Sequence, residues 1–486
     1  MPWIPDWLAP VLFITDWVLR LGLSVHIIMR RRPLAVLLSW ITLVMVAPFV
    51  GVIAYLLFGE LRLGPDRVVW KKRFTRELFE RAVVRLGVQG HLQAPTVYTG
   101  IAAYNTQAGG LPPVRGNKVA IITQPSRFID RIIADIDASQ RRACVQTYIW
   151  QLGSKADGIG EALVRAAGRG VECRVLLDDI GSRSVLRSPL ARRMSNAGVS
   201  VAPMLPVRIW KLPFRRLDVR NHRKIVVIDD QVAYCGSHNL ADETFGTSGR
   251  NPVGPWIDAS LRIEGPAAQM LQLVFLRDWE FDAGERIEHL EPFMPPIASV
   301  ADDDGVVLQV LPSGPGIASR AFEQALLTAL YTAQREVAMC TPYFVPEDAM
   351  LSAMGAAARR GVDIRLTLPR RGDSLIVAAA ARSCFDELLE AGVRLFEYRP
   401  CMLHSKIIVA DGEVAFTGSS NLDMRSFQIN YEVMLTIFDR ETCNSLARLV
   451  RTYEADSREL TPELWSMRPL LHRLGHNLAN LAGHVL

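Results

Sequence analysis

HRKIVVID at residues 222–229 and HSKIIVAD at residues 404–411 are two copies of one sequence pattern. In each copy a Lys follows the His by two positions, an Asp follows the Lys by five, and Gly-Ser-x-Asn comes next, at 236–239 and 418–421. The apolar run between Lys and Asp predicts a strand. Because alternate side chains of a strand share a face, the His and Lys of each copy should project together. The motifs therefore predict two similar units, each presenting a His and a Lys.

The sequence ahead of the motifs is duplicated as well. ALVRAAGRGVECRVLLDD at 162–179 resembles SAMGAAARRGVDIRLTLP at 352–369, and SNAGVSVAPM at 195–204 resembles LEAGVRLFEY at 389–398. Helical patterns alternate here with short apolar, β-branched runs, which is typical of α/β layering. Two copies of one series predict a pseudo-twofold pair of α/β domains.

Two apolar stretches precede the duplicated part. Leu8 to Met29 and residues 33–58 are each long enough to cross a bilayer, and three arginines join them. They predict a transmembrane helical hairpin, in which Asp16 and Arg20 pair on one face of the first helix. A cleaved signal peptide is disfavoured because no small-residue cleavage site follows the first stretch. Six basic residues after the second stretch outnumber the three in the loop, which favours cytoplasmic catalytic domains.

These features divide the chain into four parts. We expect the transmembrane hairpin at residues 1–60, a juxtamembrane linker at 61–110, a first catalytic domain at 111–298 and a second at 299–486 with a C-terminal helical tail. The cut near Ser299 lies in a stretch rich in proline and acidic residues between the two copies.

Composition argues against several classes of protein. A net charge of +5 over 486 residues is too small for a dedicated nucleic-acid binder. The seven cysteines are scattered, and no CxxC pair indicates a zinc or redox centre. We therefore expect no metal, no cofactor and no nucleic-acid partner, and reduced cysteines in a domain that faces the cytosol.

The residue types of the motifs suit phosphodiester transfer. The substrate's negative charge repels nucleophiles, so a site needs cations or hydrogen-bond donors around the non-bridging oxygens, and an activated attacker. If the halves face each other, one His can attack phosphorus while the other protonates the leaving alkoxide, through a phosphohistidine and without a metal. The predicted catalytic residues are His222, Lys224, Asp229, His404, Lys406 and Asp411, with Ser237, Asn239, Ser419 and Asn421 beside the phosphate.

With these paired motifs, residues 110–460 resemble the phospholipase D superfamily. The resemblance implies paired α/β/α sandwich domains with the active site at their interface. It implies that His222 is the nucleophile and that His404 is the general acid and base, although pseudo-symmetry leaves this order open.

The resemblance also implies that acidic residues downstream orient the histidines. Glu432 follows His404 on a strand-like run and is expected to serve it, with Asp258 as the counterpart in the first half. Asp229 and Asp411 stand about 17 Å along an extended strand from the motif histidines, so we expect them to support the structure rather than react.

Shorter stretches narrow the resemblance to the cardiolipin synthases: AYLLFGELRLG at 54–64, QTYIW at 146–150, TPYFVPED at 341–348 and NLDMRSFQINYE at 421–432. This implies that phosphatidylglycerol donates a phosphatidyl group to the enzyme, glycerol leaves, and a second phosphatidylglycerol attacks to give cardiolipin. Phosphatidylethanolamine as the second substrate stays open, as does a homo-oligomer. The resemblance further implies a multi-pass protein of the bacterial inner (cytoplasmic) membrane that acts on membrane phospholipids.

Other functions share some of these features. A phospholipase D or transphosphatidylase of other acceptor specificity would carry the same motifs, because the motifs set the chemistry and not the acceptor. A membrane-anchored nuclease is disfavoured, since the sequence has no long basic and aromatic groove. A non-catalytic lipid-binding scaffold is disfavoured because His, Lys and Asn are intact in both copies.

Two further segments suit a membrane surface. RIWKLPFRRLD at 208–218 mixes aromatic and basic residues, and an interfacial or a solvated loop fits it equally well. The C-terminal stretch 461–486 repeats leucine on one helical face, and we expect it to pack on the body rather than lie in the interface. His238, beside the first motif's Asn, is expected to make local hydrogen bonds.

Overall fold

A computed structural model of the protein describes residues 7–30, 34–59, 79, 97–206, 218–247, 252–287, 293, 305–316 and 318–483. These residues form two compact units. One contains the N-terminal helices, and the other, called the body here, contains every element from α5 to α17.

The N-terminal unit is helical. Its elements are α1 (Leu8–Ile28), α2 (Leu34–Val46), α3 (Pro48–Ala54) and the π-helix η1 (Tyr55–Gly59). Arg20 donates a hydrogen bond to Asp16 at 2.7 Å, which confirms the predicted pair. Among the described helices, α1 is the one long and apolar enough to cross a membrane. The second apolar stretch is not one continuous helix, because the chain leaves the helical conformation at Ala47, and Pro48 then starts α3.

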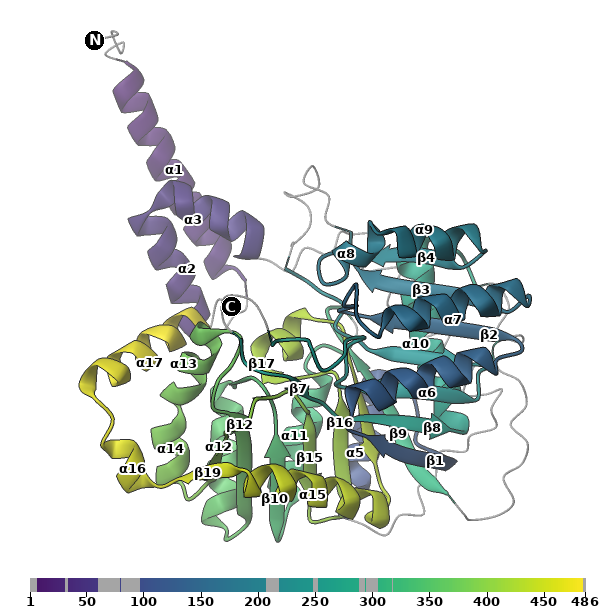
Figure 1. The fold of residues 1–486 in the computed structure, drawn as a ribbon. Coiled ribbons are helices and arrows are strands. Elements are labelled where there is room, and N and C mark those ends of the chain that lie inside the picture. Colours follow the sequence, from purple (N-terminus) through teal and green to yellow (C-terminus); the bar gives the residue numbers. More distant parts are fainter. Residues whose placement is uncertain are drawn as a thin grey trace. The chain divides into compact units, whose positions relative to one another are not determined.

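Fifteen strands of the body form one mixed sheet (Figure 1). The first half contributes β1 (Val114–Ile122), β2 (Arg142–Thr147), β3 (Glu172–Asp178), β4 (Ser200–Met204), β5 (Ile225–Ile228), β6 (Val232–Gly236) and β8 (Ser260–Glu264). The second half contributes β9 (Val306–Ser313), β10 (Glu336–Cys340), β12 (Asp363–Pro369), β13 (Arg394–Tyr398), β15 (Ile407–Ala410), β16 (Val414–Gly418), β18 (Glu432–Ile437) and β19 (Ser457–Leu460).

The strand order shows the duplication directly. From the centre outward the first half runs β1-β8-β6-β5-β2-β3-β4, and the second runs β9-β18-β16-β15-β10-β12-β13 before ending at β19. β1 and β9 are antiparallel neighbours, with Val114 opposite Leu308. A pseudo-twofold axis therefore passes between these two strands. The predicted tandem pseudo-twofold fold is confirmed.

Helices cover both faces of the sheet. On one face α10 (Pro266–Ala283) and α15 (Arg440–Ala455) share a hydrophobic core that crosses both halves. On the other face lie α6 (Pro125–Asp137), α7 (Asp157–Gly168) and α9 (Pro189–Asn196) of the first half, and α5 (Thr99–Gly109), α11 (Ala321–Thr332), α12 (Asp348–Arg359) and α14 (Phe385–Glu390), which pack on the second half. This is the predicted α/β/α layering.

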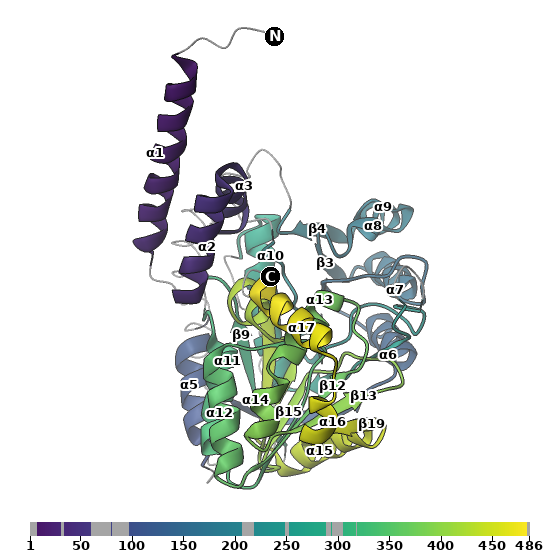
Figure 2. The ribbon, with the colours of Figure 1, turned by 90° about the vertical axis from the view of Figure 1, so that its left-hand side faces the viewer.

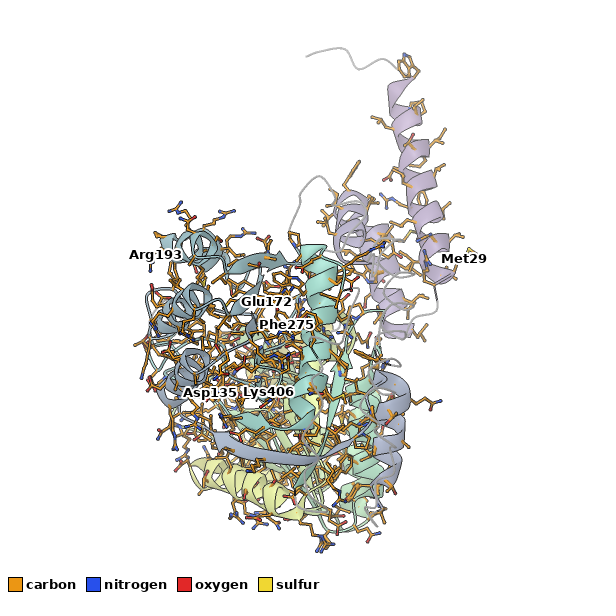
Figure 3. The ribbon with its side chains drawn as sticks, turned by 90° about the vertical axis from the view of Figure 1, so that its right-hand side faces the viewer. Met29, Asp135, Glu172, Arg193, Phe275 and Lys406 are labelled. Carbon is orange, nitrogen blue, oxygen red and sulfur yellow. The ribbon has the colours of Figure 1, made fainter. Side chains whose placement is uncertain are left out.

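α10 brings polar groups into the interior. It is buried along its whole length from Pro266 to Glu280, and Phe275 lies deep in the body (Figure 3). Arg277 and Asp278 are buried with it, and charged side chains at such depth need partners. They find those partners beside the first motif.

The structure bears on the predicted linker but not on the predicted cut between the two catalytic domains. The cut near Ser299 lies outside the described residues. Within the stretch predicted as a linker, α5 is a helix that packs on β9 and α11, and Asn105 donates to Thr436 at 3.1 Å.

Candidate active site

The two motifs meet because each half lends a short extended segment to the other. His222 N donates to Tyr431 O at 2.9 Å, and His404 N donates to Ile257 O at 2.8 Å. The second contact belongs to a parallel pair formed by β7 (Trp256–Ile257) and β14 (Met402–Leu403). The residue after each acceptor is an acid, Asp258 or Glu432. The backbone pairing thus delivers each acid to the histidine of the opposite half.

The acids are therefore exchanged between the halves. His222 Nδ1 lies 3.1 Å from both carboxylate oxygens of Glu432. His404 Nδ1 lies 2.6 Å from Asp258 Oδ1. The expectation that Glu432 serves His404 in its own half is wrong, because distance along the sequence carries no information about pairing across the pseudo-twofold axis.

The motif serines hold these acids. Ser237 Oγ donates to Asp258 at 2.6 Å, and Ser419 Oγ donates to Glu432. Burial alone would raise the pKa of each carboxyl, but the facing histidine and the serine or lysine near it outweigh burial and lower the pKa of both acids. The two carboxylates stay ionised and can orient the rings.

The two histidines differ at Nε2, the atom that faces away from the acid. Lys406 Nζ lies 2.9 Å from His404 Nε2, whereas the described residues place no lysine on His222 Nε2. The His404 side chain is 3% exposed and that of His222 is 12% exposed. Burial lowers the pKa of both rings, to about 3 for His404, where Lys406 adds to the effect.

The two lysines are buried beside the histidines. Lys224 Nζ donates to His222 O at 2.7 Å, and Lys406 Nζ donates to His404 O at the same distance. Figure 3 shows Lys406 in the interior of the body, where it is 1% exposed. Burial lowers the pKa of Lys224 to about 7 and that of Lys406 to about 8. Both ammonium groups would gain from an anion placed between them.

The motif asparagines complete the set. Asn239 and Asn421 are 4% and 5% exposed, and the Oδ1 atom of each has no hydrogen-bond partner among the described residues. Buried amides without partners are uncommon in folded proteins. The free Oδ1 of each amide would accept a hydrogen bond from a ligand hydroxyl, and Nδ2 is the atom that can donate to a phosphate oxygen. Within the part of the chain that the structure describes, no three His, Cys, Asp or Glu side chains gather as a metal would require.

Comparison with known protein families finds a match to the sequence of this chain. The family described as "Cardiolipin synthase, PLD-like domain" matches residues 132–279 and 326–453. The chain belongs to this family. A second family, "Phospholipase_D-nuclease N-terminal", matches residues 18–60. Together with α1, this match makes the protein a membrane-associated member of the cardiolipin synthase family.

Curated relatives extend the similarity over almost the whole chain. Proteins named Cardiolipin synthase A from Yersinia pseudotuberculosis serotype O:3 and from Yersinia pestis bv. Antiqua strain Angola are each 39% identical over 472 residues, 95% of either chain. A crystal structure of phosphatidylserine synthase from Haemophilus influenzae shares the fold, with a TM-score of 0.59 and 13% identity over 80% of this chain and 100% of that one.

The motif aspartates of this cardiolipin synthase family member support the backbone, as predicted. Asp229 accepts from the backbone N of Gln140, Arg141 and Arg142 at 2.8–2.9 Å. Asp411 accepts from three equivalent backbone N–H groups, those of Gln334, Arg335 and Glu336, and from Tyr98 Oη at 2.7 Å. Neither aspartate contacts a motif histidine.

The predicted motif strands are shorter than expected. β5 begins at Ile225 and β15 at Ile407, so His222, Lys224 and their second-half counterparts lie just ahead of the strands. At the two histidines the backbone pairs with a segment of the opposite half and not with a neighbouring strand of the main sheet.

Arg223 is a site residue that the sequence analysis missed. It is fully buried and donates from Nη1 to Asp278 at 2.6 Å, from Nε to Glu432 O at 2.9 Å and from Nη2 to Ser313 O at 2.8 Å. It therefore ties the first motif to the strand that carries Glu432. The signal was available: a residue between His and Lys on an extended chain faces the other way, into the core, where a charge needs partners.

Two aromatic rings were also missed. The Tyr148 ring centroid lies 5.0 Å from that of His222, and the Trp256 centroid lies 4.2 Å from that of His404. Tyr148 stands in the quoted QTYIW and Trp256 stands two residues before Asp258, but nothing in the sequence says that the two rings reach the histidines. His238, as expected, has a local role: its ring stacks on Phe128 and Nδ1 lies 2.9 Å from Ser260 Oγ. Residues 207–217, which contain nearly all of the basic aromatic segment, lie outside the described residues.

Replacing Asp411 with Ala should destabilise the folded body by about 2 kcal/mol, because three partly buried backbone N–H groups lose their acceptor. Burial opposes ionisation of this carboxyl, yet its backbone donors and Tyr98 outweigh burial and lower its pKa. A lowered pKa contributes stability above the pKa of the unfolded state, and that contribution disappears as pH falls through the folded value. Unfolding in detergent, followed by fluorescence, should therefore show a smaller deficit in acid than at neutral pH.

Tyr98→Phe is the matched control, because it removes one donor to Asp411 and leaves the backbone contacts in place. It should cost about 1 kcal/mol. Equal losses for the two variants would contradict the role assigned to the backbone contacts.

Proposed function

We propose that the protein is a cardiolipin synthase that transfers a phosphatidyl group from one phosphatidylglycerol to the hydroxyl of another, giving cardiolipin and glycerol. The observation that carries this proposal is the convergence of two acid-oriented histidines and two buried lysines from opposite halves. The names of the relatives and the family agree with it. Membrane association agrees with a bilayer phospholipid as the substrate.

In the first step His222 Nε2 attacks the phosphorus of the donor. The bond from phosphorus to the oxygen of the headgroup glycerol breaks, and this glycerol leaves with a proton from His404. In the second step the hydroxyl of the second phosphatidylglycerol gives its proton to His404 and attacks phosphorus. The phosphorus–nitrogen bond then breaks, which releases cardiolipin and restores His222.

The contacts at Nε2 support this order. His222 Nε2 has no lysine on it and its lowered pKa leaves the ring neutral near pH 7, so its lone pair is available for attack. His404 Nε2 is held by Lys406. A bound phosphodiester would attract Lys406, and its negative charge would raise the pKa of His404, so His404 could then carry the proton that the leaving alkoxide needs.

The remaining motif residues divide into three groups in this proposal. Lys224, Lys406, Asn239 and Asn421 bind the non-bridging oxygens and stabilise charge in the transition state. Glu432 and Asp258, held by Ser419 and Ser237, orient the two imidazoles. Asp229 and Asp411 tie the far ends of the motif strands to the starts of β2 and β10.

The finer placement in the cell is also a proposal. A multi-pass anchor in the bacterial inner membrane with cytoplasmic catalytic domains fits the two apolar stretches and the basic residues that follow them. The division at residues 60, 110 and 298 fits the duplicated sequence. A homo-oligomer would be compatible with this arrangement.

Purified protein given labelled phosphatidylglycerol alone should form cardiolipin and free glycerol in equal amounts. His222→Ala and His404→Ala should each lower the rate by at least about 10²-fold, because nucleophile and acid are separate requirements. Lipid mass spectrometry together with a glycerol assay measures both products. Phosphatidic acid as the sole lipid product would replace the synthase proposal with a hydrolase.

The exchange of acids predicts different effects for Glu432→Gln and Asp258→Asn. With a p-nitrophenyl phosphatidyl ester, whose leaving group needs no proton, Glu432→Gln should slow the burst of nitrophenol because its partner His222 is the nucleophile. Asp258→Asn should leave the burst intact and slow the turnover that follows. Rapid-mixing absorbance measurements separate the two phases, and the opposite pattern would reverse the assignment of the histidines.

The rate constant kcat/KM should fall as pH rises above about 7 to 8, because buried Lys224 and Lys406 lose their charge there. A lysine binds phosphate as its protonated form, which predominates below its pKa. Lys224→Arg, which keeps its charge and removes the lower of the two pKa values, should lower the rate but move the alkaline limb upward. A profile of kcat/KM that stays level to pH 9 would contradict this role.

A further inference from the structure

One helix of the body exposes its apolar side chains. In α17 (Leu470–Gly483), Leu471 is 79% exposed, and Leu474 and Leu478 are each 56% exposed. Their spacing of three and four residues places them on one face of the helix. A face of this kind is normally buried against the protein. The C-terminal stretch packs on the body along α13 (Leu375–Ser383), as expected, but this leucine face does not make the contact and points into solvent.

A different face of α17 contacts the body. The helix packs along α13 (Leu375–Ser383), and the two lie side by side in Figures 1 and 2. His476 stacks on Trp465, a residue of α16 (Pro462–Ser466), with ring centroids 5.9 Å apart. The packing that fixes α17 thus leaves the leucine face free.

The first turn of α13, the helix on which α17 packs, is also apolar and exposed. Leu375 is 74% exposed and Ile376 is 52% exposed. We call the exposed residues of the two helices the apolar platform. The platform consists of Leu375, Ile376, Leu471, Leu474 and Leu478.

Cations accompany the platform. Arg370 and Arg371 precede α13, and Arg473 lies on α17 between two of the leucines. All three are exposed, and none forms an ion pair with a described carboxylate. Exposed leucines with unpaired arginines form a surface that favours an anionic bilayer, whereas two copies meeting through this face would bring like charges together.

The platform is connected to the rim of the candidate active site. Tyr343 Oη donates to Asp373 Oδ1 at 2.6 Å, and Asp373 stands two residues before α13. Tyr343 leads into β11 (Phe344–Val345), whose partner β17 (Leu422–Asp423) directly follows Asn421. A few residues of ordered chain therefore separate the platform from a predicted phosphate-binding side chain.

We propose that the apolar platform seats the rim of the active site on an anionic phospholipid bilayer, so that the site draws its lipid directly from that surface. This inference rests on the proposed function, since it assumes that the substrate is a bilayer phospholipid. The leucines enter the acyl boundary, and the arginines lie at the headgroups.

The test compares two forms of substrate on one preparation of the full chain in liposomes. In the triple variant Leu471→Ser, Leu474→Ser and Leu478→Ser, the rate with long-chain phosphatidylglycerol in the bilayer should fall about tenfold. The rate with short-chain phosphatidylglycerol, supplied as monomers from solution, should not change. Tyr331→Ser and Leu152→Ser, which alter exposed side chains elsewhere on the body, should leave both rates unchanged.

Equal losses with both substrates, or no loss with either, would overturn the proposal. If the wild-type chain makes no cardiolipin from either substrate, the proposed function fails, and a second measurement still decides on the platform. A fluorophore on Leu474→Cys should be quenched by nitroxide-labelled lipid in the same liposomes, and one on Tyr331→Cys should not. No quenching at position 474, or cross-linking of Leu474→Cys into dimers in place of quenching, would reject bilayer contact.

Discussion

The exchange of acids between the two halves is the interaction on which the rest of the site depends. Each histidine takes its backbone partner and its carboxylate from the opposite half, as the contacts of His222 with Tyr431 and Glu432 show. Neither half could assemble an oriented imidazole alone. Duplication therefore does more than double the number of side chains in the site, because each half supplies part of the structure around the other half's motif.

Burial explains why this exchange has to be so well paired. Two lysines, two carboxylates and two imidazoles lie together where water is largely excluded, and each charge would be costly there by itself. Glu432 and Asp258 reduce the desolvation cost of their own charges by accepting hydrogen bonds from a histidine and a serine. Burial lowers the pKa values of the two lysines. The site thus holds cations that a phosphodiester anion would stabilise.

The pseudo-symmetry is broken in the surroundings of the two motif histidines. Arg223 separates the His and Lys of the first motif and ties them to Asp278 and β18, whereas Ser405 holds that position in the second and reaches Tyr453. Lys406 covers one ring nitrogen, and Tyr148 and Trp256 flank different histidines.

The sequence by itself determined much of this protein. Motif spacing and the repeated flanks predicted two α/β units and named the histidines, lysines, asparagines and serines, because local patterns reflect local backbone geometry. The supporting role of Asp229 and Asp411 followed from their distance along a strand. The Asp16–Arg20 pair followed from helical periodicity.

Only the tertiary structure decided which acid serves which histidine, that Arg223 reaches Glu432, and that the leucines of α17 face outward. These facts depend on contacts between residues far apart in the chain. Pairing across a pseudo-twofold axis leaves no periodic trace in the sequence, since a strand segment reads the same whichever half it joins.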